Sequence, residues 1–325
     1  MSYSRANIRL AMEILSERKA KAELTYSKRR EEITNKIPEI GKCLSQMTDI
    51  SLKILEAAQS EDFQKNLEEI KQTNNRIQDL IASKLKENGY PEDYLEIPYT
   101  CKKCSDTGVV GRDTCSCMKD LLNQLNIKDL EDSSPAKGCS FENFSLDYYP
   151  DVSLDGKSIS PRAQMKVVYE FCKDYADDFD ADSGSIYMHG ETGLGKTHLS
   201  LAIGNAAARK GYSVYYASAQ TLLADIEREK FGREKSAVSE NKALGCDLLI
   251  IDDLGCEFGT QFSAAEIYNI INYRINQSKP FIISTNLDWE ELEKKYSKRV
   301  ASRIIGSCSN LKFIGNDIRQ IKSFN

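Results

Sequence analysis

The 325-residue chain has no long hydrophobic run, no secretion signal and no strong charge of either sign. No apolar run approaches the ~18–20 residues that span a bilayer, and the first ten residues lack the apolar core of a signal peptide. We therefore expect a cytoplasmic protein with no membrane partner. The net charge of −5 excludes a globally basic nucleic-acid coat, but it does not exclude a local basic strip.

The sequence predicts four regions along the chain. Residues 1–95 are expected to be a helical, partner-binding region, because apolar residues recur there at helical spacing. Residues 96–125 are a cysteine-rich knuckle, and residues 126–159 are an acidic, turn-rich linker or ordered arm. Residues 160–325 alternate between apolar strands and helices, which indicates an α/β domain whose parallel sheet is flanked by helices.

Three helices are predicted in the first region, with Met12 and Leu80 among the residues of their apolar faces. Pro38 falls in the first turn of the second helix, where a proline is tolerated. Ser60 is a suitable N-cap for the third helix, and the run of residues 88–91 (NGYP) stops it. The pattern leaves open whether these helices form a small bundle or a module that docks on a partner.

Ten cysteines without a secretion signal indicate reduced thiols or a metal site rather than a disulfide framework. Four of them form two close pairs: Cys101, Cys104, Cys115 and Cys117. Paired cysteines supply the four soft ligands of a tetrahedral zinc site, and such a site is structural because no coordination position is left open. Gly108 and Gly111 lie between the pairs, where a returning hairpin needs positive φ. The alternative is four unrelated thiols.

The remaining cysteines are scattered along the chain, and we expect them to be small buried hydrophobes rather than ligands. They are Cys43, Cys139, Cys172, Cys246, Cys256 and Cys308.

Residues 190–197 read GETGLGKT, which is the phosphate-binding pattern G-x-x-x-x-G-K-T, between an apolar strand and a helix. Backbone N–H groups of such a loop converge on phosphate oxygens. Lys196 is expected to reach the β- and γ-phosphates of ATP, and Thr197 to hold Mg²⁺ through its hydroxyl. The expected nucleotide-binding residues are Gly190, Glu191, Thr192, Gly193, Leu194, Gly195, Lys196 and Thr197.

Two further apolar strands end in polar groups. Residues 248–253 end in Asp252, which suits the Mg²⁺ shell, and Asp253, which suits a general base or water-orienting role. The alternative for Asp253 is a surface acid at a strand end. Asn286 follows residues 280–285 and is placed to orient the attacking water or to touch the γ-phosphate. The sequence thus predicts a site at the carboxyl edge of a parallel sheet.

These motifs together resemble a known family. GETGLGKT, LLIIDDLG, FIISTN and the closing KRVASRI…GNDIRQ are similar to the AAA+ ATPases of the DnaC/DnaI helicase-loader type and to the related IstB-type transposition ATPases. YTCKKCSDTG and FENFSLDYY also resemble the DnaI-like branch. The resemblance covers residues 90–325. It implies an ATPase that loads a replicative DNA helicase, binds single-stranded DNA in DNA replication and assembles with further copies of itself.

The alternative implied by the same resemblance is an IstB-type ATPase that regulates a transposase. The helical region and the knuckle favour the loader, since the IstB-type pattern is that of a shorter chain. A small-molecule P-loop kinase is disfavoured, because nothing resembles a substrate lid.

The resemblance also implies roles for two arginines. Arg303 matches the family's arginine finger, which acts on a neighbouring subunit's γ-phosphate, and Arg319 matches its second sensor arginine; the alternative for both is a solvated surface charge. Asp253 stands where many AAA+ proteins have a glutamate. After residue 286 we expect one helix and a closing hairpin, with no separate helical lid.

Cations surround an aromatic residue near the end of a helix that precedes residue 248. Arg228, Lys230, Phe231 and Arg233 are the expected nucleic-acid contacts, because stacking and phosphate neutralisation suit single strands. This stretch resembles the family's insertion that touches single-stranded DNA. The alternative is an ordinary charged helix end with Phe231 in the core, which nearby acids support.

Overall fold

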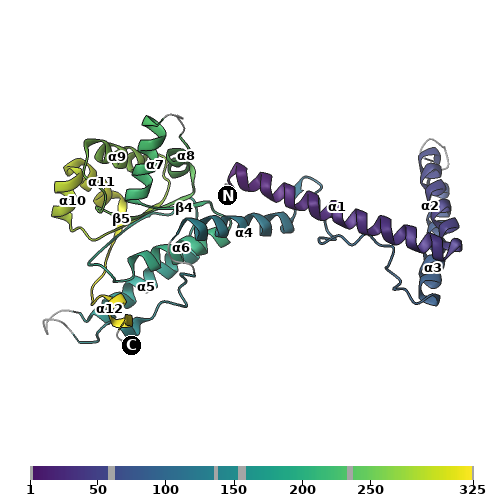
Figure 1. Cartoon of the computed structure of the whole chain (residues 1–325), viewed down its shortest axis with the longest axis horizontal. Helices are drawn as coiled ribbons and strands as arrows, with labels where there is room; N and C mark the ends of the chain where they lie inside the picture. Colours follow the sequence, from purple (N-terminus) through teal and green to yellow (C-terminus); the bar gives the residue numbers. More distant parts are fainter. Residues whose placement is uncertain (1–2, 58–62, 135–137, 153–158, 233–236, 324–325) are drawn as a thin grey trace. The chain divides into compact units, whose positions relative to one another are not determined.

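The computed structural model describes residues 3–57, 63–134, 138–152, 159–232 and 237–323 (Figure 1). The chain divides into two compact units, one of residues 12–118 and one of residues 1–11 with 119–325. The predicted division into four regions stays a prediction. No helix among the described residues is long and apolar enough to cross a membrane.

Three helices dominate the unit of residues 12–118. They are α1 (Arg5–Lys36), which begins in the other unit, α2 (Pro38–Ala57) and α3 (Phe63–Glu87). Pro38 is the first residue of α2, as predicted, and α3 stops two residues before Gly89, whose φ of 79° is left-handed. The predicted cap Ser60 lies outside the described residues.

One small apolar cluster joins these helices. Its buried members are Ile33, Ile37, Ile40, Cys43, Ile77, Ile81 and Leu85. Met12 and Leu80, expected on apolar faces, are exposed instead. Beyond the helices the unit holds a short antiparallel hairpin of β1 (Val109–Val110) and β2 (Asp113–Thr114).

A five-stranded parallel sheet forms the centre of the second unit. Its strands are β3 (Ser185–His189), β4 (Val214–Ser218), β5 (Leu248–Leu254), β6 (Phe281–Thr285) and β7 (Cys308–Lys312). They lie in the order β4-β5-β6-β3-β7, with every pair parallel. The central strands are continuous apolar runs because both of their faces are buried.

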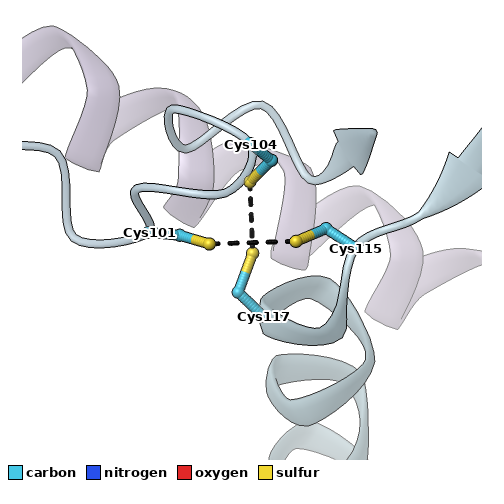
Figure 2. Close-up of side chains that lie close together, drawn as sticks. All are labelled: Cys101, Cys104, Cys115 and Cys117. Atoms are coloured by element: carbon cyan, nitrogen blue, oxygen red, sulfur yellow. Dashed lines mark hydrogen bonds between the residues drawn. The ribbon is translucent and has the colours of Figure 1, made fainter. Parts of the chain in front are cut away.

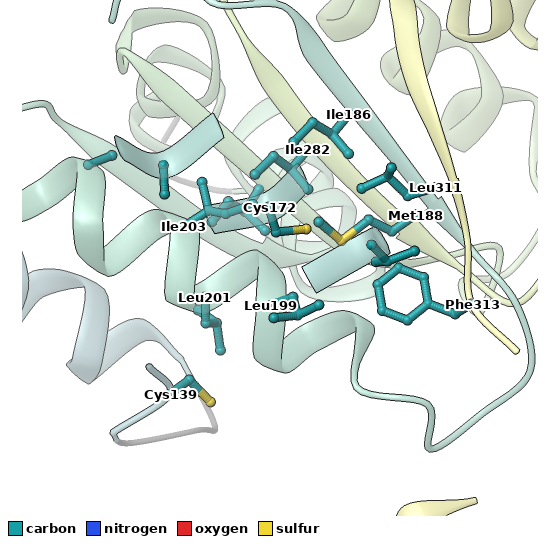
Figure 3. Close-up of a cluster of buried hydrophobic side chains, with 14 of the residues drawn as sticks. Cys139, Cys172, Ile186, Met188, Leu199, Leu201, Ile203, Ile282, Leu311 and Phe313 are labelled. Atoms are coloured by element: carbon teal, nitrogen blue, oxygen red, sulfur yellow. The ribbon is translucent and has the colours of Figure 1, made fainter. Parts of the chain in front are cut away.

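Helices cover both faces of this sheet (Figure 1). Side chains alternate across the strands, so Ile250 and Ile282 contribute to one cluster while Leu249 and Ile283 contribute to the other. The first cluster, part of which Figure 3 shows, packs on α5 (Pro161–Asp178) and α6 (Lys196–Arg209). The second packs on α7 (Ala219–Phe231), α8 (Val238–Gly245), α9 (Gln261–Asn276), α10 (Trp289–Tyr296) and α11 (Lys298–Ser307).

Three further elements complete the unit. They are α4 (Ser116–Ser133), which begins in the other unit, the 3₁₀ helix η1 (Leu146–Tyr148) and α12 (Ile318–Ser323).

The expected single helix and closing hairpin after residue 286 are wrong. Two helices, α10 and α11, follow β6, and β7 then pairs in parallel with β3. A helical crossover returns the chain to the starting edge of the sheet, which makes the next strand parallel rather than antiparallel. In the described residues after β7 the only helix is the six-residue α12, so the expectation of no separate helical lid agrees with this part of the chain.

Candidate functional site

The phosphate-binding loop lies between β3 and α6, at the carboxyl edge of the sheet. Gly190, Gly193 and Gly195 have φ values of 143°, 77° and 86°, which residues with a Cβ rarely adopt. A Cβ at Gly190 would lie 2.3 Å from the carbonyl oxygen of Phe313. Glycine is therefore required at this position for conformation and for space.

Lys196 is held inside this loop. Its Nζ donates to the carbonyl oxygens of Gly190 and Glu191, at 2.6 Å each, and to Oδ1 of Asn286, at 2.7 Å. The residue is only 5% exposed. Burial lowers the pKa of Lys196 to about 8, and the charge of Arg319 acts in the same direction, against the two acids of β5.

The Asp252 carboxylate is surrounded by hydroxyl groups from three elements. Thr197 of α6 donates to both of its oxygens, at 3.0 and 3.1 Å, Tyr216 of β4 donates to Oδ2 at 2.7 Å, and Ser284 of β6 donates to Oδ1. Hydroxyl and carboxylate oxygens are the ligands that Mg²⁺ prefers. Thr197 and Asp252 therefore fit a magnesium ion.

Asp253 follows with φ 52°, which turns its side chain away from the buried face of the strand. The residue is exposed overall and lines the pocket. Partial burial of its carboxylate, together with the charge of Asp252, raises the pKa of Asp253, whereas the charges of Lys196 and Arg319 act to lower it. A carboxylate with a raised pKa is a better proton acceptor in catalysis.

A pocket of about 550 Å³ opens beside these residues. Its lining includes predicted site residues from the loop and the start of α6, from the ends of β5 and β6, and from α12: Thr192, Gly193, Leu194, Gly195, Lys196, Thr197, Asp253, Asn286 and Arg319. Gly190 and Glu191 are not part of this lining, but their carbonyl oxygens accept hydrogen bonds from Lys196. The volume and the chemistry of this lining fit a nucleotide.

Part of the pocket wall was not predicted. Asn143, Phe144, Ser145 and Tyr148 lie in the region expected to be a linker or arm, and they line the pocket with His198 of α6. Nearby, the Tyr149 hydroxyl donates to the carbonyl oxygen of Leu194 at 2.8 Å, which ties this segment to the loop. Its four aromatics within nine residues were the available sequence signal.

The two arginines of the closing segment occupy different places. Arg319 lines the pocket, whereas Arg303 is absent from its lining and lies over the ring of Tyr268, 5.4 Å from the ring centre. Asn286 is the only member of the expected catalytic set that contacts Lys196 directly in the described residues.

The four paired cysteines converge on one point (Figure 2). Their sulfurs lie within 4.8 Å of one another, at 3.8 Å for Cys101 and Cys115 and 3.4 Å for Cys104 and Cys117. Four sulfurs at about 2.3 Å from a tetrahedral zinc ion lie about 3.8 Å apart, so the cluster fits this metal. Buried Asp106 supports it by accepting from the backbone N–H of Cys101 at 2.8 Å.

The other cysteines are mostly buried, as expected. Cys43, Cys139, Cys172 and Cys246 are buried and Cys308 is partly exposed, but Cys256 is exposed and lines the pocket. For Cys256 the expectation was wrong.

The expected nucleic-acid contacts lie at the end of α7. Phe231 is 73% exposed, so it is not a core residue, and its ring meets that of Phe262 at 5.5 Å. Lys230 pairs with Glu266 at 2.8 Å and with Glu240 at 3.4 Å, and Arg228 pairs with Asp225. Arg233 lies outside the described residues.

The chain is similar in sequence to known ATP-binding proteins. The model of the IstB-like ATP binding protein family matches residues 163–323. A replicative helicase loader DnaC from Buchnera aphidicola subsp. Acyrthosiphon pisum is 25% identical over 75% of this chain and 94% of its own length. The chain resembles the DnaC-type AAA+ helicase loaders. DnaC of Escherichia coli K12 is 26% identical over 58% of this chain and 69% of its own.

A solved structure of the DnaC helicase loader covers 55% of this chain and 100% of its own, at 23% identity and a TM-score of 0.45. The predicted arrangement is confirmed by the structure itself: an α/β domain with a parallel sheet flanked by helices follows an α-helical region. The match to an ATP-binding family agrees with the phosphate loop and supports ATP as the nucleotide.

Proposed function

We propose that this chain is an ATP-dependent loader of a replicative DNA helicase. The observation that carries the proposal is the extent of the alignment with the Buchnera loader. It spans 251 residues and therefore reaches beyond the ATPase region of residues 163–323. The shared sequence thus includes part of the amino-terminal region, where we expect the helicase to bind.

Within the site, the loop residues and Lys196 bind the phosphates, while Thr197 and Asp252 hold Mg²⁺, which supplies charge neutralisation when bound. Asp253 accepts the proton of the attacking water, and its raised pKa suits this role. Asn286, whose Oδ1 accepts a hydrogen bond from Lys196, orients that water. Arg319 contributes positive charge from the pocket wall.

The ATP site is completed by a second copy of the chain. Arg303 lies outside the lining of its own pocket and is partly exposed. A cation on the surface of the unit can contact the γ-phosphate that a neighbouring subunit binds. We therefore propose a homo-oligomer in the active state.

The cysteine cluster holds a structural zinc ion. Its four sulfurs match tetrahedral spacing and leave no open ligand position, so the metal stabilises the fold rather than taking part in chemistry.

Single-stranded DNA is the proposed nucleic-acid ligand of the α7 end. Exposed Phe231 offers a stacking face, and Arg228, which pairs with Asp225 but has a largely exposed side chain, contributes charge. Lys230 is engaged by two acids, so its share is smaller. Phe231→Ala should weaken binding of a fluorescent oligonucleotide by about 1–3 kcal/mol, roughly 5- to 150-fold. Tyr273→Ala, at an exposed aromatic of α9, is the control, and equal affinities for both variants would remove Phe231 from the interface.

Co-purification with the replicative helicase of the same cell tests the proposal. The full chain should form a complex with the helicase and transfer it to circular single-stranded DNA in the presence of ATP. Asp253→Asn should still bind a fluorescent ATP analogue but lose about 10²–10⁴-fold in turnover. The control Asp182→Asn changes an exposed acid outside the pocket lining.

An IstB-type ATPase that regulates a transposase is the second candidate, because the matching family model carries the IstB description. Capture of a transposase together with no complex with the helicase would favour it and would contradict the loader.

A further inference from the structure

The ladder between β5 and β6 is interrupted beside the two acids. Ile251 pairs with Ile283 and Leu254 pairs with Thr285, so Asp252 and Asp253 together face the single residue Ser284. This two-against-one arrangement is a β-bulge, which breaks the regular backbone hydrogen bonds and re-aims side chains. The φ of 52° at Asp253 marks the same irregularity.

The Ser284 hydroxyl replaces the missing ladder bond. Its Oγ accepts from the backbone N–H of Asp253 at 3.0 Å, and it donates to Oδ1 of Asp252. One hydroxyl thereby satisfies a backbone donor and orients a carboxylate. Ser284 has no exposed surface, so water does not substitute for it when the hydroxyl is removed.

The remaining bonds to Asp252 do not fix Asp253. Tyr216 and Thr197 donate only to the Asp252 carboxylate, from β4 and α6. Ser284 is the described side chain that bonds both to the carboxylate of Asp252 and to the backbone of Asp253. Ser284 also lies two residues before Asn286 on the same chain segment. Its hydrogen bonds therefore link the segment that carries Asn286 to both acids.

We propose that Ser284 is a positioning residue that holds Asp252 for Mg²⁺ and Asp253 for water across the bulge. The inference rests on the proposed ATPase function and assigns a role to a fully buried side chain outside the pocket lining. Groups of this kind, which orient a metal ligand, typically change metal affinity or activity by about 10–100-fold when they are removed.

The experiment compares Ser284→Ala, Ser284→Thr and a matched control, Ser185→Ala. Ser185 is also a buried serine of the sheet that accepts a backbone N–H, from Phe281 at 3.1 Å, but it lies at the start of β3 and outside the pocket lining. The control therefore loses the same kind of hydrogen bond away from the site.

Two readouts are independent of hydrolysis. The first is the Mg²⁺ concentration needed for half-maximal tightening of fluorescent ATP-analogue binding, and the second is amide hydrogen exchange at Asp253 in nucleotide-free protein. Ser284→Ala should raise the Mg²⁺ requirement about tenfold or more and accelerate exchange at Asp253. Binding in EDTA should change less than about twofold, since Lys196 is untouched. Ser284→Thr should restore both readouts, and Ser185→Ala should leave both at wild-type values.

The proposal would be overturned if Ser284→Ala kept the wild-type Mg²⁺ requirement and the wild-type exchange rate at Asp253. It would also be overturned if Ser185→Ala changed both quantities as much as Ser284→Ala does. If Ser284→Ala does not fold, Ser284→Cys, which is close in size and forms weaker hydrogen bonds, should raise the Mg²⁺ requirement above that of wild type; an unchanged requirement would overturn the proposal. If the wild-type chain tightens its nucleotide binding with Mg²⁺ but never hydrolyses, the proposed function is contradicted, whereas a raised Mg²⁺ requirement in Ser284→Ala still supports the role of Ser284 in holding Asp252.

Discussion

The two units of the chain are stabilised in different ways. The unit with the sheet buries two large apolar clusters, one on each face of the strands. In the described part of the unit of residues 12–118 there is one small cluster between the helices, together with four converging thiols. A small apolar core rarely supplies enough free energy alone, and a metal commonly makes up the difference. We therefore expect a bound metal to matter more for the folding of the unit of residues 12–118 than for the unit with the sheet.

Loss of zinc should have the largest effect, and only on the helical unit. Metal binding contributes about 10–16 kcal/mol to folding in zinc-finger peptides, so Cys104→Ser should release the metal and abolish the unfolding transition of this unit. Affinity for a fluorescent ATP analogue should stay within about twofold of wild type, because the pocket residues belong to the other unit.

The control for this change is Cys43→Ser, a buried cysteine of the same unit outside the cluster. Metal analysis and calorimetry provide the measurements. Metal-free wild-type protein with four titratable thiols at these positions would refute the zinc site and the difference between the units.

Removal of Arg303 should have the next largest effect, on the sheet unit alone. An arginine that stabilises the charge on a phosphoryl group during its transfer contributes about 10³-fold or more in kcat. Arg303→Ala should therefore lower kcat by this factor, whereas its nucleotide affinity should hardly change. Arg303→Ala protein, with its own loop intact, is mixed with Lys196→Ala protein, which retains Arg303. The mixture should regain part of the ATPase activity that each lacks alone.

Arg299→Ala is the matched control, since Arg299 is an exposed cation of the same helix, α11. It should keep wild-type turnover. If the two variants assemble together and the mixture stays inactive, Arg303 acts within its own subunit. The ATP site of the sheet unit would then need no residue from a second copy.

The smallest predicted effect is a pH dependence of nucleotide binding. Lys196 has its pKa lowered to about 8 in the free protein, and phosphate charge favours its protonated form. Affinity should therefore be full below pH 8 and fall as pH rises above it, by at most about tenfold per pH unit. Titration of ATP-analogue binding from pH 7 to about 9.5 measures this.

Lys196→Arg should bind more weakly but without the slope, because an arginine stays charged up to about pH 12. Zinc retention should be the same across this range, since the thiol cluster lies in the other unit. A flat wild-type profile would show that Lys196 is charged throughout the range despite its burial.

Local patterns in the sequence predicted the structural elements that carry the candidate site. Gly190 to Thr197 is a motif whose spacing fixes its own geometry, and the apolar run before Asp252 specifies a buried strand. The convergence of four cysteines followed in the same way from short spacings.

Features that depend on distant contacts escaped prediction. Strand β7 has only one buried residue, so nothing in its pattern distinguished a parallel strand from a hairpin. Lys230 was expected to be free for phosphate, but Glu266, 36 residues away, engages it. The contribution of Phe144 and Tyr148 to the pocket depends on the folding of the arm onto the loop, which no local period reveals.

The three hydrogen bonds that Lys196 donates bear on how strongly the loop can hold a phosphate group. Phosphate oxygens that bind this ammonium group compete with two backbone carbonyl oxygens and with the amide oxygen of Asn286. The net gain in free energy is therefore the difference between two sets of hydrogen bonds, which is smaller than the gain from pairing an ammonium group that has no partner. The protein's own oxygens thus moderate the affinity for nucleotide at the residue that contacts the phosphates.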